Sequence, residues 1–311
     1  MKYTIIKLRP KSSFHIGERE DWREGSKIHI PSDTLFSALC HCYHLLYGEV
    51  DTLLDGFLSH EPPFLISSAF PYVDDTYFFP VPKNKIPKDK STKKIKFVEK
   101  QALELLLSGK ELDDIINSVK TIPPTEVFTV EDIPRIGLSR LSNHPGENYF
   151  YFGQVTYRKD AGLFVLITFK ETNISDKIFA CFNLLSHEGI GGDRTCGKGM
   201  FEKPIVSQID LKVPDTVGFY SLSVYYPLDE KELSGIDRSF YELEERKGYM
   251  FSPFNKSLRR RSIRVFVEGS VFAVDERPVG TLVDVTPDSF KSHKIYRYCF
   301  LFALPCVVGG L

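Results

Sequence analysis

The sequence lacks long hydrophobic runs and any pairing pattern among its cysteines. No apolar stretch in the 311 residues reaches the length of a membrane-spanning helix, and the short one near the N-terminus is interrupted by charge, unlike a signal peptide. The six cysteines show neither disulfide-like spacing nor a C-x-x-C motif. We therefore expect a protein without a membrane segment that works in a reduced, cytoplasmic setting.

The sequence also lacks net charge. The formal value is −1, whereas dedicated nucleic-acid binders are often strongly basic. The charges are unevenly spread, however: eight lysines lie between Lys83 and Lys100, and a second basic run is 259–261 with Arg264. Acids gather elsewhere, at 229–232 and 242–245. A protein with separate basic and acidic faces can bind RNA on one side and protein on the other.

The first two thirds of the chain carry a pattern of alternating strands and helices. Alternation predicts a strand at 3–8, and apolar residues at helical spacing predict a helix that Ser32 caps and Gly48 ends. Two strands at 149–157 and 163–169, joined by a hairpin turn at 159–162, precede a helix at 176–187 and a strand at 205–211. This order predicts an α+β, ferredoxin-like domain, as in RNA-recognition modules.

The domain boundaries follow from the same pattern. We expect residues 1–212 to form the first ferredoxin-like (RRM-like) domain, with a basic insertion at about 60–145 that holds a short helix near 97–107. Residues 213–311 are rich in predicted strands, at 219–226, 262–268, 280–285 and 295–304, with a short helix in the charged segment 229–246. A second, degenerate ferredoxin-like domain is the simplest interpretation of that part.

A glycine-rich segment between the second helix and the last strand of the first domain is the best functional signal. Five glycines lie between Gly189 and Gly199, with Arg194 and Lys198 among them. Glycine permits positive φ and close approach of another backbone, and consecutive exposed N–H groups can hold an anion. The segment is neither a Walker A loop nor a dinucleotide fingerprint, because the spacing and the order of elements differ. It predicts a grip on a sugar-phosphate backbone; the alternative is a plain flexible connection.

A glycine-rich loop after the second helix resembles the RAMP superfamily of CRISPR proteins. Three further stretches resemble the fourth subunit of the type III-A Csm complex: IPSDTLFSALCHCYH (30–44), IPRIGLSRLSNHPGENYFY (133–151), and RRRSIRVFVEGSVF (259–272) with the following PVGTLVDVTP and HKIYRYCFLFALP. They span nearly the whole chain in the right order. The lysine-rich part of the insertion matches nothing in that family, and its role stays open.

This resemblance implies two ferredoxin-like domains and a non-catalytic subunit that binds the 5′ tag of crRNA. It also implies two protein neighbours, the large polymerase-like subunit and the backbone subunit, which carry the chemistry. The alternative is a metal-independent endoribonuclease that processes CRISPR repeats with His15 as general base. The sequence shows no obvious acid–base pair, which favours the first interpretation.

We expect RNA contacts from the loop, from His15 after the first strand, from the first helical turn and from arginines ahead of the hairpin. The predicted RNA-binding residues are His15, Ser32, Thr34, Arg135, Arg140, Gly191, Gly192, Arg194, Gly197, Lys198 and Gly199. Asp33 is explained by the dipole of its helix. Cys40 and His44 share a helix face but lack further ligands, so we predict no metal and no cofactor.

Overall fold

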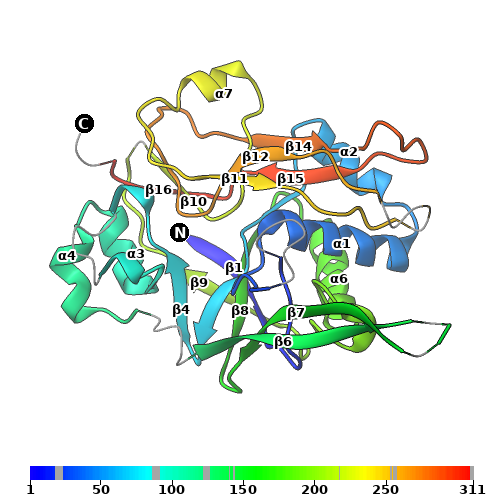
Figure 1. Ribbon diagram of the computed structural model, residues 1–311. Helices are drawn as coiled ribbons and strands as arrows, with labels where there is room; N and C mark the ends of the chain where they lie inside the picture. Colours follow the sequence, from blue (N-terminus) through cyan, green and yellow to red (C-terminus); the bar gives the residue numbers. More distant parts are fainter. Residues whose placement is uncertain are drawn as a thin grey trace.

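The computed structural model describes residues 1–17, 24–85, 92–121, 127–139, 141–142, 144–216, 218–252, 254 and 258–308. The protein is a mixed α and β structure whose sheets are antiparallel (Figure 1). Its largest sheet has the strand order β5-β4-β3-β8-β1-β9, and β2 also pairs with β8. These strands are β1 (Lys2–Leu8), β2 (Phe64–Ile66), β3 (Phe70–Val73), β4 (Thr76–Pro80), β5 (Phe97–Glu99), β8 (Ala161–Phe169) and β9 (Ile205–Asp210).

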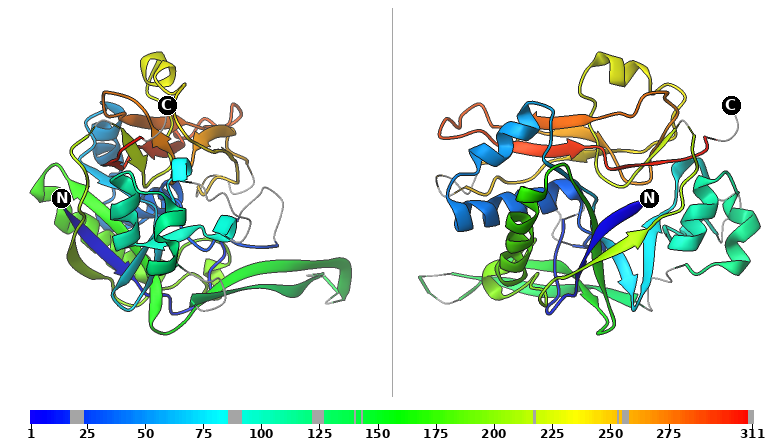
Figure 2. Two further views of the ribbon diagram at one scale, coloured as in Figure 1. Left: turned by 90° about the vertical axis from the view of Figure 1, so that its left-hand side faces the viewer. Right: turned by 180° about the vertical axis from the view of Figure 1, so that it is seen from behind.

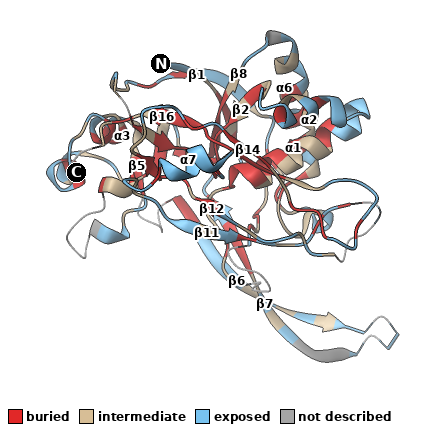
Figure 3. Ribbon diagram, turned by 90° about the horizontal axis from the view of Figure 1, so that it is seen from above, coloured by how far each residue is buried: buried red, intermediate tan, exposed pale blue. Residues whose placement is uncertain are grey.

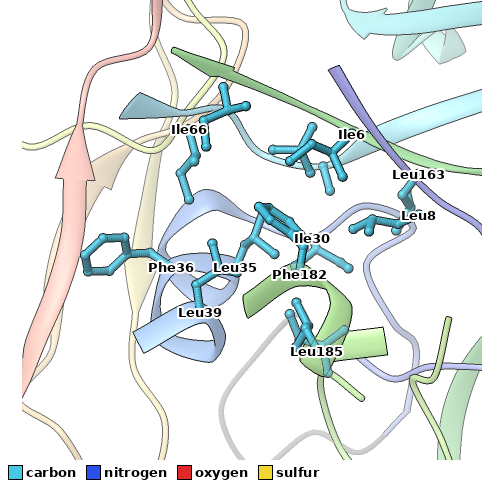
Figure 4. Packing of buried hydrophobic residues seen from close by; sticks show 14 of the residues in the cluster. Ile6, Leu8, Ile30, Leu35, Phe36, Leu39, Ile66, Leu163, Phe182 and Leu185 are labelled. Atoms are coloured by element: carbon cyan, nitrogen blue, oxygen red, sulfur yellow. The ribbon is translucent and has the colours of Figure 1, made fainter. Parts of the chain in front are cut away.

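Helices α1 (Ser32–Tyr47) and α6 (Ser175–Glu188) cover one face of this sheet. Figure 4 shows Leu35, Leu39, Phe182 and Leu185 from these helices packed together with side chains of β1 and β8. Both helices end at a glycine with positive φ, Gly48 (φ 82°) and Gly189 (φ 74°), and the predicted end of the first helix at Gly48 is confirmed.

The other face of the sheet is also covered. Ile6 and Leu8 of β1 belong to the core beneath α1 and α6, whereas Ile5 belongs to a second core on the opposite side, as the alternation of a strand requires. That second core includes α3 (Lys100–Leu107) and α4 (Leu112–Ile115). Because both faces are covered, β8 is an unbroken apolar run, buried from Ala161 to Ile167.

The last third of the chain forms three small antiparallel sheets that lie over α1 and the large sheet (Figure 1). Asp229 caps its short helix by accepting a hydrogen bond from Glu232 N. Both cores contain residues of this part, so they are shared along the whole chain. Its elements are β10 (Phe219–Ser221), α7 (Glu230–Ser234), β11 (Leu243–Arg246), β12 (Ile263–Phe266), β13 (Val271–Phe272), β14 (Gly280–Asp284), β15 (Tyr296–Phe300) and β16 (Ala303–Pro305).

Helix α2 (Asp51–Leu58) follows α1. None of the helices in the described part of the chain is long and apolar enough to cross a membrane. The predicted strand at 3–8, helix at 176–187 and strand at 205–211 are confirmed within one or two residues. In the last third the predicted strands at 262–268, 280–285 and 295–304 and the short helix are confirmed, whereas only Phe219–Ser221 of the strand predicted at 219–226 is a strand.

The predicted hairpin between the strands at 149–157 and 163–169 is wrong. The first of them is β7 (Pro145–Tyr157), and it pairs with β6 (Phe128–Leu138) instead. Together β6 and β7 form a long two-stranded arm that projects from the body (Figures 2 and 3). The sheet position beside β8 belongs to β2 and β3, so residues 64–73 are part of the sheet rather than of an insertion into it.

Two helix starts also differ from the predictions. Residues 97–99 pair as strand β5 with β4, and the helix begins only at Lys100. Ser32 is the first residue inside α1 and caps nothing, since its hydroxyl accepts a hydrogen bond from Val224 N at 3.1 Å. In both cases a distant segment provides the hydrogen-bond partner, which local sequence does not reveal.

Candidate nucleic-acid interface

The glycine-rich loop folds back on itself and lies against the segment that follows β1. Ile190 N donates to Gly199 O at 3.0 Å, and Gly199 N donates to Ser13 O at 2.9 Å. Gly192 N donates to His15 O at 2.9 Å. The loop is therefore held in one shape by backbone hydrogen bonds rather than hanging free.

The glycines of the loop serve two different purposes. A Cβ on Gly191 would lie 2.2 Å from His15 O, and one on Gly199 would lie 2.0 Å from Ile190 O, so both positions need close backbone approach as well as positive φ. Gly197 has φ 78°, but a Cβ there would meet nothing within 4 Å. Gly197 is exposed to solvent. The open side of the loop is thus at Gly197.

The two cations of the loop point in different directions. Lys198 Nζ lies 2.7 Å from Ser13 Oγ and 3.1 Å from Gln154 Oε1, so this ammonium fastens the loop to β7 and the segment after β1. The guanidinium of Arg194 lies 4.6 Å above the ring of Phe251 in the last third of the chain. A cation above a ring keeps its edge donors available to other acceptors.

His15 and Arg135 meet the loop at the base of the arm. The His15 ring lies 4.5 Å from the Phe152 ring, and its Nδ1 lies 2.7 Å from Gly153 O. Arg135 lies 4.4 Å above Phe152 and forms an ion pair with Asp193 of the loop. Burial lowers the pKa of His15, which favours the neutral ring. With Nδ1–H donating to the carbonyl, Nε2 is left as an acceptor.

Ser32 and Thr34 lie elsewhere, between α1 and the last third of the chain. Ser32 is fully buried, and its N–H donates to Ser68 Oγ at 2.8 Å, so both of its polar groups have partners inside the protein. Thr34 Oγ1 accepts from Arg246 Nη2 at 3.2 Å. The structure therefore does not bring this helix turn to the glycine loop, and Ser32 has no polar atom open to a ligand.

Asp33 is explained differently from the prediction. Its carboxylate accepts hydrogen bonds from Arg246 at 2.7 and 3.1 Å and from Arg297, in a fully buried cluster. Burial alone would raise the pKa of Asp33, but the two guanidinium groups hold it well below its usual range. These ion pairs fix α1 to β11 and β15.

The other residues considered as metal ligands or RNA contacts lie on helix α1, on the arm of β6 and β7, or outside the residues that the structure describes. Cys40 is packed near Cys42 and Cys181, and burial raises the pKa of its thiol. No group of three or more His, Cys, Asp and Glu side chains suited to a metal ion occurs among the described residues. Tyr149 and Tyr151 are exposed on the arm, and Arg140 lies outside the described residues.

Several residues of this interface were missed from the sequence. Ser13 and Gln154 accept hydrogen bonds from Lys198. The rings of Phe152 and Phe251 lie under the guanidinium groups of the arginines at 135 and 194. The serines before His15 were a local signal of a polar loop, but nothing local links Phe251 to a loop more than fifty residues earlier. Only the packing of the last third against the glycine loop reveals that pair.

The comparisons with known proteins all point to Csm4 proteins of CRISPR systems. Residues 215–306 match the family model of the CRISPR Csm4 C-terminal domain. "CRISPR system Cms protein Csm4" of Thermococcus onnurineus is 25% identical over 97% of this chain and 96% of its own length, and the protein of that name from Streptococcus thermophilus is 26% identical over 88% and 90%.

Solved structures give the same result for the fold. A chain of the Csm3-Csm4 subcomplex of the type III-A CRISPR-Cas interference complex matches with a TM-score of 0.65, 21% identity, and coverage of 98% and 99%. A chain of the Csm1-Csm4 cassette in complex with pppApA matches with a TM-score of 0.64, 21% identity, and coverage of 99% of each chain. The predicted resemblance to the fourth Csm subunit is thus confirmed.

Proposed function

We propose that this Csm4-like chain is a non-catalytic RNA-binding subunit of a type III-A CRISPR ribonucleoprotein. It holds the 5′ tag of crRNA and bridges the large polymerase-like subunit and the backbone subunit. The observation that carries the proposal is the glycine loop, which is held rigid against His15 and presents Arg194 and the open Gly197 at its outer side. The relatives named with Csm1 and Csm3 support the two protein neighbours.

We infer that residues 1–212 form a ferredoxin-like domain in which β2 and β3, not β7, occupy the second strand position. The chain order β1, α1, β3, β8, α6, β9 and the sheet order β3-β8-β1-β9 support this. Residues 213–311 would be a more degenerate counterpart, since their small sheets carry one short helix in the part that the structure describes.

The chemistry of the site suits RNA rather than a small molecule. A backbone phosphate can lie against the open side of the loop, where Arg194 supplies charge-assisted hydrogen bonds. The Nε2 atom of His15 can accept a hydrogen bond from a ribose 2′-hydroxyl, the group that distinguishes RNA from DNA. Lys198 supports the loop from inside through Ser13 and Gln154, and so its contribution is positioning.

The test is co-purification of the chain with the neighbouring subunits, followed by sequencing of the bound RNA and a salt series of RNA affinity. Arg194→Ala removes one phosphate contact, so the slope of log affinity against log salt should fall by about 0.7 for single-stranded RNA. The loss should be similar for different sequences, because phosphate contacts carry no base information. The matched control is Lys231→Ala, which removes a cation from helix α7, where Lys231 forms an exposed ion pair with Glu276. This variant should leave the slope of log affinity against log salt unchanged.

Two results would contradict the proposal. Absence of RNA from the purified complex would remove the RNA-binding role. Specific cleavage of repeat RNA by the isolated chain, lost in His15→Ala, would instead support the endoribonuclease.

A further inference from the structure

A loop of the last third lies beside the glycine loop and folds back on itself. Arg260 N donates to Gly248 O at 2.9 Å, and Met250 N donates to Leu258 O at 3.0 Å, so Tyr249 lies opposite Arg259 as in a short antiparallel ladder. Residues 253 and 255–257 lie outside the described residues. The ladder fixes the direction in which the side chains of 249–252 point.

The side chains of this loop alternate between the interior and solvent. Met250 and Ser252 are buried, and Ser252 Oγ lies 2.9 Å from His293 Nε2. Tyr249 and Phe251 are 51% and 52% exposed, and Phe254 is 70% exposed. Because alternate residues of an extended chain share a face, the rings of Tyr249 and Phe251 project from the same side. The exposed rings of Tyr249 and Phe251 form an aromatic strip, and exposed apolar groups beside polar ones are typical of binding surfaces.

Arginines flank the aromatic strip. The guanidinium of Arg259 lies 5.2 Å from the centre of the Tyr249 ring and donates to its hydroxyl at 3.2 Å. Arg260 Nε donates to Tyr249 O at 3.2 Å. Arg194 of the glycine loop lies over Phe251, so the glycine loop and the aromatic strip are joined in one surface by a direct contact.

Of two acids around this loop, Asp284 is engaged in ion pairs, whereas Glu188 lies beside the His41 ring, whose pKa is lowered by burial. Glu188 lies 3.9 Å from His41, whose ring meets Phe251 edge-on at 5.0 Å. Asp284 pairs with Lys294 at 2.7 Å and with Arg261 at 3.6 Å. Burial, followed by the nearby charge of Arg297, lowers the pKa of Arg260 to about 10.

We propose that bases of single-stranded RNA stack on the aromatic strip formed by Tyr249 and Phe251 while the glycine loop holds the phosphates. Single-strand binders combine aromatic stacking faces with a cationic path for the backbone, and this surface has both. The geometry favours RNA over a protein partner because Arg194 lies over the Phe251 ring, which places a cation for phosphate beside a ring that can stack on a base. The inference rests on the proposed function and adds base contacts to it.

The experiment compares the full-length parent and two single variants on two ligands. Affinities of the parent and of Tyr249→Leu and Phe251→Leu are measured for a short single-stranded RNA and for an abasic ribose-phosphate chain of equal length. Each substitution should weaken binding of the RNA roughly 5- to 150-fold, the range for losing one stacked base, and leave binding of the abasic chain unchanged. The salt slope should stay at the parent value, because no charge is removed.

Tyr241→Leu is the matched control. Its ring is also exposed, but it packs edge-on against Phe266 and has Glu242 as its neighbour, away from the arginines. It should bind both ligands like the parent, and all variants should melt like the parent.

Three outcomes decide the inference. Selective loss of RNA affinity in the variants of the aromatic strip supports it. Parent-like RNA affinity in both variants overturns it, and if these variants also fail to co-purify with the neighbouring subunits, the surface is a protein interface instead. If the parent itself binds neither ligand, the proposed RNA-binding function fails and the inference fails with it, whereas a parent that binds RNA and loses salt slope in Arg194→Ala leaves the proposed function standing whatever the variants of the aromatic strip do.

Discussion

At the scale of single residues, the buried ion cluster around Asp33 is the clearest determinant of stability. Asp33→Asn would leave the guanidinium groups of Arg246 and Arg297 buried without a counter-charge. Removing one partner of a buried pair costs about 3–5 kcal/mol. We expect the free energy of unfolding, measured by urea denaturation at neutral pH, to fall by that amount.

The control for Asp33→Asn is Asp75→Asn. Asp75 pairs with Lys7 at 3.0 Å, but its side chain is 97% exposed, so its loss should cost less than about 1 kcal/mol. The pH dependence gives a second readout. Because the folded pKa of Asp33 is lowered, its contribution is complete above the unfolded pKa near ~4 and is lost as the pH falls below it. Equal losses in the two variants would contradict this account.

At the scale of elements, the glycine loop allows a sharper prediction than its composition did. Gly197→Ala should cost only about 1–2 kcal/mol, the cost of a left-handed conformation with a side chain, because its surroundings are open. Gly191→Ala has the same backbone cost and in addition forces a Cβ against His15 O, which adds about 1–3 kcal/mol of overpacking. Thermal melts of both variants should therefore rank Gly191→Ala as the less stable. The reverse order would show that the loop is not held against His15.

The elements that local sequence predicted are those with one buried face. Strand β1 and helices α1 and α6 bury a periodic set of side chains, and the pattern therefore appears in the sequence. Strand β6 has exposed residues on both faces and contains Pro134, so neither alternation nor propensity marks it as a strand. Without β6, β7 had no visible partner except β8, and the predicted hairpin followed from that.

The candidate site was predicted in part for the same physical reason. The need for positive φ is a property of a single position, so the glycines at 191 and 199 indicated a loop of unusual shape in the sequence itself. Side-chain partners are not local: Asp33 meets Arg246 across 213 positions, and Lys198 meets Ser13 across 185. Whether a cation faces solvent or fastens a loop depends on these long-range contacts, which composition and spacing do not contain.

At the scale of the whole molecule, residues 1–212 and the last third of the chain share the two largest hydrophobic clusters, and the last third has two smaller clusters of its own. Phe36 of α1 stacks on Tyr298 of β15 with ring centres 4.7 Å apart, and Figure 4 shows it pointing away from the sheet toward the last third. On the other face of the sheet, Phe164 lies in one cluster with Tyr220 and Leu304. The two largest hydrophobic clusters therefore extend across the predicted boundary near residue 213.

This sharing predicts that the full chain unfolds in one transition. A fragment of residues 1–212 would expose the face of α1 that meets β15 and leave Asp33 without both arginines, so it should bind a hydrophobic dye and be cleaved rapidly by protease. Far-UV and near-UV circular dichroism of the intact chain in urea should give coincident curves, as a cooperative unit requires. Adding residues 213–311 in trans should restore protection, since the same contacts reform between fragments. A 1–212 fragment that is protected by itself, with two separate transitions in the intact chain, would show that the halves fold independently despite their common cores.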